Sequence, residues 1–188
     1  RIQSLEQELI EEIQNQQSAF AYEIQQRRIL FEQQVIQQHK IYLQQLLDYL
    51  RTASLKNILS APIIWAVFFP TVLLDLGVTL YQTICFPIYG IPKVKRSDYI
   101  IFDRQYLNYL NIIEKINCAY CSYFNGIIAY IQEVAARTEQ YWCPIKHARH
   151  IGTLHSRYQH FLDYGDAKLY RQHKEEVRTQ FDDIQQEK

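Results

Sequence analysis

The first 56 residues of the chain contain no glycine and no proline. Both residues interrupt helices, so their absence favours one long uninterrupted helix. In rows of eleven from Ile2, the first position is always Ile, Val or Leu, and the eighth is Leu, Phe, Tyr or Ala. Eleven residues over three turns give about 3.67 residues per turn, which is close to a straight helix and slightly right-handed when supercoiled. Residues 1–56 are therefore predicted to form a long helix with one apolar stripe.

The same residues lack a sizeable net charge, since six basic and seven acidic side chains leave −1. This excludes an electrostatic attraction to nucleic acid or to anionic lipid. The polar face is rich in Gln and Glu and poor in Lys, which disfavours a helix that binds the lipid surface. We expect the stripe to be buried by self-association or by helices of a partner. Packing on the C-terminal part of the same chain is the alternative.

The chain also lacks the patterns of common catalytic and nucleic-acid sites. It shows no glycine-rich phosphate loop, no Ser-His-Asp arrangement, no prominent carboxylate pair and no basic-aromatic stripe. An enzymatic activity is thus not indicated, although it is not excluded. The sequence contains no Met and begins with Arg1, so we expect the natural N-terminus upstream, and the missing secretory signal is uninformative.

A long apolar run extends from Ile58 to Ile91, and Asp75 is its only charged residue. About 20 helical residues cross the hydrocarbon core of a membrane. Residues 57–92 are therefore predicted to be a membrane-embedded helical segment, with a single crossing preferred to a re-entrant hairpin or a buried soluble core. Pro62 and Pro70 are expected to bend it.

Polar and aromatic residues suggest how this segment is oriented. Asp75 is expected near the membrane surface or at the cap of a broken helix, and a proton or ion site is the alternative. More basic residues follow the segment than precede it, which favours a cytoplasmic C-terminal part. Those that follow are Lys93, Lys95, Arg96 and Arg104, those that precede are Lys56 and Arg51, and candidate interfacial anchors are Trp65, Tyr81 and Tyr89.

Residues 93–188 are long enough for one small domain, and their pattern is helical throughout. Asn125-Gly126 predicts a turn, and Cys143-Pro144 predicts a helix boundary. The expected helices cover residues 97–123, 127–142, about 144–161, and part of the tail after 163. The chain is thus predicted to be all-α, with parts at 1–56, 57–92 and 93–188.

Cysteine and histidine spacing suggests a metal site in this C-terminal part. Cys118 and Cys121 form a C-x2-C motif, and Cys143 and His147 form C-x3-H after a gap of 21 residues. Thiolates and imidazole at such spacing suit zinc or an iron–sulfur centre. A helical hairpin at Asn125-Gly126 would hold the two pairs apart, so the site would require unwound helix ends or two chains. The hairpin would place Glu133 near C-x2-C, and a returning third helix would add His155, as alternative ligands.

Two other interpretations of the cysteines stay open, namely inert buried residues and thiol redox chemistry. Cys143 lies just ahead of a predicted helix start, where the helix dipole would lower the pKa of its thiol. It is therefore the best candidate for a reactive cysteine. Cys118 and Cys121 could form a redox pair, and Cys85, inside the apolar run, is expected to be a small core residue.

Short motifs between residues 62 and 171 are FPIYGIP at 86–92, RSDY at 96–99, NCAYC at 117–121, ARTEQYWCPIKH at 136–147 and DYGDA at 163–167. Together they resemble a family of small bacterial membrane proteins that has no assigned activity. The resemblance covers more than half of the chain and implies a location in the bacterial inner membrane, with nothing catalytic. The eleven-residue repeat lies outside it.

We therefore expect a membrane-anchored helical assembly or interaction protein without a defined catalytic activity. Its partners would be the lipid bilayer and other helices bound through residues 1–56, and nucleic acid is not expected. A metal-binding or electron-transfer module using Cys118, Cys121, Cys143 and His147 is the main alternative. A thiol oxidoreductase using Cys143 is a weaker one.

Overall fold

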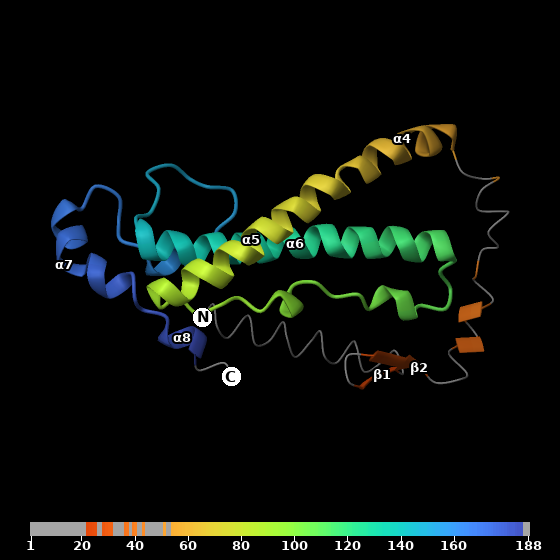
Figure 1. Ribbon diagram of the computed structural model, residues 1–188, viewed down its shortest axis with the longest axis horizontal. Coiled ribbons are helices and arrows are strands. Elements are labelled where there is room, and N and C mark those ends of the chain that lie inside the picture. Colours follow the sequence, from red (N-terminus) through yellow and green to blue (C-terminus); the bar gives the residue numbers. More distant parts are fainter. Residues whose placement is uncertain are drawn as a thin grey trace. The chain divides into compact units, whose positions relative to one another are not determined.

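The computed structural model describes residues 22–25, 28–31, 36–37, 39–40, 43, 51 and 54–185. Helices dominate this part of the chain (Figure 1), in agreement with the predicted fold class. The chain divides into two compact units, Arg1–Ser60 with Phe102–Cys121, and Ala61–Ile101 with Ser122–Lys188. The second unit thus joins most of the apolar segment to the C-terminal residues.

A short antiparallel strand pair lies inside the predicted N-terminal helix. Strand β1 covers Tyr22–Gln25 and β2 covers Arg28–Phe31, and Tyr22 pairs with Phe31. The prediction of a continuous helix is wrong for these eight residues. Apolar and polar side chains alternate in β1, and the two strands contain the aromatic or β-branched residues Tyr22, Ile24, Ile29 and Phe31, which favours a strand as much as a helical stripe. Most of residues 1–56 lies outside the described residues, so the repeat stays a prediction.

Helices α4 (Leu55–Ala66) and α5 (Phe68–Tyr89) follow one another without a chain reversal (Figure 1). Together they form one 35-residue helical segment that is long and apolar enough to cross a membrane. The break at Val67 follows from Pro70, which has no amide hydrogen to donate to the carbonyl of Ala66. A re-entrant hairpin within the segment is therefore wrong. Within the described residues, only 11% of its most apolar window is buried.

Helix α5 ends before Gly90, where the chain reverses direction and runs back along the helix. Gly90 has a φ of 68°, in the left-handed region that suits glycine, and the amide of Ile91 donates to the carbonyl of Phe86 at 2.9 Å. Residues 91–101, which we call the return segment, follow and contain the 3-10 turn η1 (Arg96–Asp98), and a second turn, η2, covers Arg104–Tyr106. The helix predicted over 97–123 is thus wrong before residue 112.

Helix α6 runs from Ile112 to Trp142 without interruption. Asn111 and Glu114 form a capping box: the Glu114 amide donates to Asn111 Oδ1 at 3.0 Å, and the Asn111 amide donates to Glu114 Oε2 at 2.8 Å. The turn predicted at Asn125-Gly126 is wrong. A Cβ at Gly126 would lie 2.6 Å from the carbonyl oxygen of Tyr99, so this glycine permits a close backbone approach.

The predicted boundary at Trp142 is confirmed, but the helix expected after Pro144 is wrong. Residues 143–166 form loops, a parallel bridge between Ile145 and Leu162, and the 3-10 turn η3 (Tyr158–His160). Helix α7 follows at Ala167–Val177, and α8 covers Asp182–Gln185. Asp166 caps α7 by accepting from the Leu169 amide at 2.8 Å.

The hydrophobic core lies within the second unit. Phe86 of α5 and Ile127 and Tyr130 of α6 are fully buried there. The return segment contributes apolar side chains, and Phe181, near the C-terminus, is also buried in this core. The remaining buried members are Ile91, Val94, Ile100 and Val134.

Candidate functional site

Polar side chains of α5 face α6 and the return segment. We call this set the polar seam; it comprises Asp75, Thr79 and Gln82 of α5 together with Arg96, Tyr123 and Tyr130. Thr71, Asp75 and Gln82 are three of the four buried residues of α5, and the fourth is Phe86. All four lie on one face of the helix, because their spacings of four, seven and four residues match the helical period.

Asp75 is bound by three side chains. Arg96 donates from Nη2 to Oδ2 at 2.6 Å and from Nε to Oδ1 at 3.1 Å, which is a bidentate pair. The Tyr123 hydroxyl donates to Oδ2 at 2.8 Å, and Thr79 donates to Oδ1 at 3.3 Å. Burial and the hydrogen bond to Asp75 raise the pKa of Tyr123 above its ordinary value. The buried carboxylate is therefore fully paired.

Gln82 binds the return segment as a neighbouring strand would. Its Nε2 donates to the carbonyl of Val94 at 3.1 Å, and the Val94 amide donates to its Oε1 at 2.8 Å. Its Nε2 also donates to the hydroxyl of Tyr130 at 2.8 Å. The amide of Gln82 thus satisfies both polar backbone atoms of a buried residue, which otherwise would cost stability.

A second buried pair fixes the start of the return segment. Arg137 donates to Glu133 at 2.7 Å and to the carbonyl of Pro92 at 2.8 Å. Ser156 donates to the other oxygen of Glu133 at 2.5 Å. Glu133, predicted as an alternative metal ligand, has its carboxylate oxygens engaged by Arg137 and Ser156.

A third network holds the C-terminal end. Arg157 is buried and donates to Gln140 Oε1 at 2.5 Å, to the carbonyl of Gln180 at 3.0 Å and to both carboxylate oxygens of Asp183. Partial burial acts to raise the pKa of Asp183, but the hydrogen bond and positive charge of Arg157 outweigh it and lower the pKa. This network links α6, the loop after it and α8.

The predicted metal ligands are distributed along α6 and beyond it. Cys118 and Cys121 lie in α6, whereas Cys143 follows its last residue. The 22 residues from Cys121 to Cys143 amount to about six helical turns, so one chain does not bring the pairs together. His147 is exposed and its ring stacks on Tyr158. Within the described residues, no group of three or more His, Cys, Asp or Glu is arranged to hold a metal.

Two local expectations about this chemistry are wrong. No helix begins directly at Pro144, since residues 143–157 form loops and a bridge, so the dipole argument for a reactive Cys143 does not hold. Instead, Cys143 lies at the C-terminal end of α6, where its amide donates to the carbonyl of Glu139 at 2.7 Å. Residues 144–161 do not form the predicted returning helix, and His155 lies beside Glu139, with Nε2 3.2 Å from the carboxylate.

Sequence reasoning missed the polar seam, although its signal is present. The polar residues of α5 recur at helical spacing within the apolar run, at Thr71, Asp75, Thr79 and Gln82. The residues that bind these side chains could not be predicted from the sequence pattern in the same way. Arg96 was counted only as a flanking charge, because nothing local shows that the chain returns along α5.

Comparison with known proteins identifies no relative: no family model, curated protein or solved structure matches this chain. The resemblance to a family of bacterial membrane proteins therefore stays a prediction.

Proposed function

We propose that this protein is a membrane-anchored helical assembly or interaction protein, in which α4 and the outer face of α5 contact lipid. The observation that carries the proposal is the inverted polarity of α5. Its inner face buries Thr71, Asp75 and Gln82, whereas a water-soluble helix buries its apolar stripe and exposes its polar one. The outer face exposes Phe69, Leu73, Leu76, Leu80, Ile84 and Ile88, each by more than half.

The size of this apolar surface favours lipid over water as the environment of the outer face of α5. Burying one large apolar side chain contributes roughly 1.5–3 kcal/mol. Six such side chains left in water therefore forgo on the order of 10 kcal/mol, which is comparable to the whole stability of a small domain. Contact with acyl chains removes this cost.

Helix α4 supports the same proposal by a different feature. None of its twelve residues is buried, and it exposes Leu55, Ile58, Leu59, Ile63 and Ile64. Its polar residues lie in the first half, at Lys56, Asn57 and Ser60, and an apolar helical stretch that remains exposed is typical of a membrane span. We propose that residues 55–74 enter the bilayer, because 20 residues extend about 30 Å, the thickness of its hydrocarbon core.

The Asp75–Arg96 pair supports a position near the headgroups. A charged side chain at the bilayer centre costs at least about 2.5 kcal/mol, and Arg96 keeps 45% of its side chain exposed. The 35 residues of the segment extend about 52 Å, more than the bilayer thickness, and long segments commonly tilt. An oblique anchor lets Arg96 reach the headgroups while the outer face of α5 stays in contact with acyl chains.

Aromatic side chains gather at the end of α5. The rings of Tyr89, Tyr141 and Trp142 lie 5.1 to 5.3 Å apart, and Trp142 is half exposed. Amphipathic rings of this kind concentrate at the membrane–water interface. Of the predicted anchors, Tyr81 instead points inward and shares a hydrogen bond of 3.1 Å with Thr138.

The interaction part of the proposal rests on residues 1–56. Outside residues 22–31 their repeat predicts a helical apolar stripe, and such a stripe requires a partner, either another copy or another helical protein. Chemical cross-linking of the full chain in membranes tests this. Cross-linked species through residues 1–56 are expected, and an exclusively monomeric chain would contradict self-association.

Fractionation of the full chain tests the anchor. We expect the protein in the membrane pellet after alkaline carbonate washing, and in solution only after detergent is added. A chain that stays in the supernatant without detergent would overturn the proposal.

Labelling of cysteines tests a single crossing. In a background without native cysteines, Asn57→Cys and the restored Cys143 report the two ends of the anchor. An impermeant maleimide applied to sealed vesicles is expected to label only one of the two. Equal labelling at both positions would show that the segment does not cross.

A further inference from the structure

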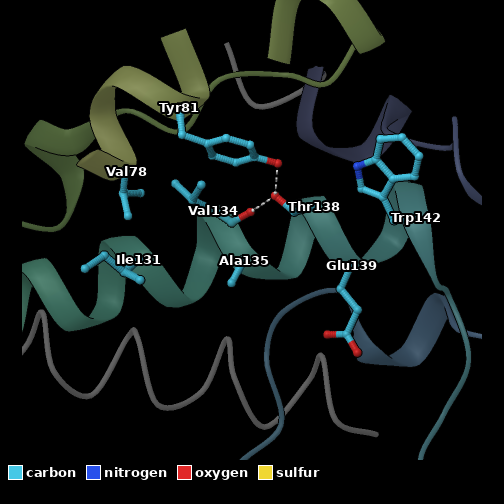
Figure 2. Close-up of a pocket in the computed structure, with 8 residues that line it drawn as sticks. All are labelled: Val78, Tyr81, Ile131, Val134, Ala135, Thr138, Glu139 and Trp142. Atoms are coloured by element: carbon cyan, nitrogen blue, oxygen red, sulfur yellow. Dashed lines mark hydrogen bonds between the residues drawn. The ribbon is translucent and has the colours of Figure 1, made fainter. Parts of the chain in front are cut away.

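An apolar groove of about 420 Å³ lies between α5 and α6 of the second unit (Figure 2). This volume falls within the range of roughly 300–1,000 Å³ that is typical of ligand pockets. Figure 2 shows the Tyr81 ring lying over the groove, with Val78 and Ile131 toward one end and Trp142 and Glu139 toward the other. Val134, Ala135 and Thr138 complete the lining.

The groove continues the apolar outer surface of α5. Leu74, Val78 and Tyr81 follow one another at steps of four and three residues, so they form one stripe along the helix. Leu74 at the start of this stripe is half exposed, whereas Val78 and Tyr81 line the groove. An acyl chain that contacts Leu74 can therefore pass into the groove without crossing polar surface.

Helix α6 provides the opposite wall in the same manner. Ile128, Ile131, Ala135, Thr138 and Trp142 recur at alternating steps of three and four residues. Ile128 exposes 51% of its surface just beyond the groove. The lining residues of α5 and α6 thus form the two walls of the groove.

The polar atoms of the groove already have partners. The hydroxyls of Tyr81 and Thr138 lie 3.1 Å apart, and Thr138 donates to the carbonyl of Val134 at 2.8 Å. The carboxylate of Glu139 lies 3.2 Å from His155 Nε2. The groove therefore favours an apolar occupant, and its one charged lining residue, Glu139, lies toward the Trp142 end.

That end carries the features of a headgroup region. Trp142 stands with Tyr89 and Tyr141, and the guanidinium of Arg178 lies 4.0 Å from the centre of the Tyr141 ring. Aromatic rings with a nearby cation are typical of the membrane interface.

We propose that the groove binds one acyl chain of a membrane phospholipid, with the chain terminus near Val78 and Ile131 and the headgroup near Trp142. The inference rests on the proposed membrane anchor, because continuity with lipid-covered surface selects the occupant. A bound acyl chain fills the space between the two helices and so supports their packing.

Photo-cross-linking tests the groove directly. The full chain is reconstituted in phosphatidylcholine vesicles that contain a phosphatidylcholine with a diazirine at the end of one acyl chain, and adducts are located by mass spectrometry. We expect adducts on Val78 or Ile131 in excess of those on Leu76 or Leu80, which face the general lipid.

A matched pair of alanines on α6 provides the variants. Ala135 and Ala129 are both exposed, but only Ala135 lines the groove. Ala135→Phe occupies the space of several methylene groups and is expected to reduce the groove adducts about tenfold. Ala129→Phe is expected to leave them unchanged.

The outcomes separate this inference from the anchor. Adducts spread evenly over α5, equal effects of both variants, or protein–protein cross-links in place of lipid adducts would each overturn the groove while the protein remains in the vesicles. Failure of the protein to associate with vesicles would instead overturn the anchor itself.

Discussion

Two Arg–Asp pairs hold the protein together, and their burial is opposite. In the Asp75–Arg96 pair the aspartate side chain is buried and the arginine side chain is 45% exposed. In the Arg157–Asp183 pair the arginine side chain is 3% exposed and the aspartate side chain is 49% exposed. Both pairs are bidentate, but they leave a different charge behind when the exposed partner is removed.

The two pairs therefore differ in how well the buried residue is satisfied after its exposed partner is removed. Without Arg96, Asp75 would retain only hydroxyl donors, from Tyr123 and Thr79. Without Asp183, Arg157 would still donate to Gln140 and to the carbonyl of Gln180. The seam of the proposed anchor should therefore be more sensitive to the loss of its exposed partner than the C-terminal network.

The largest effect is expected from Arg96→Ala. It leaves a buried carboxylate without its cation, which typically costs about 3–5 kcal/mol, reduced here because Arg96 is partly exposed. Thermal unfolding of the full chain in detergent, followed by circular dichroism, measures the loss. Arg96→Lys keeps the charge without the bidentate geometry and should lose less. An Arg96→Ala variant as stable as the native chain would break the comparison.

Gln82→Leu is expected to cost about 2–3 kcal/mol, since it leaves the amide and carbonyl of the buried Val94 without their partner. Gln132→Leu, at an exposed position of α6, is the control and should change stability by less than about 0.5 kcal/mol. The same unfolding measurement compares them. Equal stability of the two variants would show that Gln82 does not hold the return segment.

Gly126→Ala tests the close approach that positions the return segment. The new Cβ would lie 2.6 Å from the backbone oxygen of Tyr99, so a shift costing about 1–3 kcal/mol is expected. Gly77→Ala in α5 meets nothing within 4 Å and should be neutral or slightly stabilising. If both glycines tolerate alanine equally, the packing of residues 99–100 on α6 is not as described.

The smallest effect is expected from Asp183→Asn, at most about 1 kcal/mol because Asp183 is half exposed. Since the folded-state pKa of Asp183 lies below its ordinary value of 3.8, the contribution of its charge is present above pH 3.8 and is lost as pH falls through the folded pKa. The difference in stability between the native chain and the variant should therefore be present at neutral pH and should shrink toward acid pH. Unfolding curves of both proteins at the two pH values measure this difference. A difference that grows toward acid pH would contradict this sign.

The sequence predicted the features that depend on local composition. The apolar segment, its bend near Pro70 and the end of α6 at Trp142 all follow from side-chain polarity and proline chemistry. The all-helical class of residues 54–185 follows from the same period. These signals act within one or two helical turns and need no knowledge of distant residues.

Contacts between residues that are far apart in the sequence could not be predicted from it. Gly126 was interpreted as a turn, because sequence alone does not show that the backbone at Tyr99 passes beside it. The pairing of Asp75 with Arg96 depends on the left-handed Gly90, which reverses the chain. The prediction of a helix starting at Pro144 is wrong because this segment forms backbone hydrogen bonds with residues near Leu162. The Leu162 amide donates to the carbonyl of Pro144 at 2.8 Å.

The most direct test of the proposed anchor is the environment of the outer face of α5. Single nitroxide labels at Leu76, Leu80 and Ile84, in a cysteine-free chain reconstituted in vesicles, report collisions with oxygen and with a water-soluble nickel chelate. Lys95, an exposed residue of the return segment, serves as the aqueous reference. Lipid contact predicts more oxygen collisions than nickel collisions at all three positions and the reverse at Lys95. Nickel collisions as frequent at the three positions as at Lys95 would contradict it.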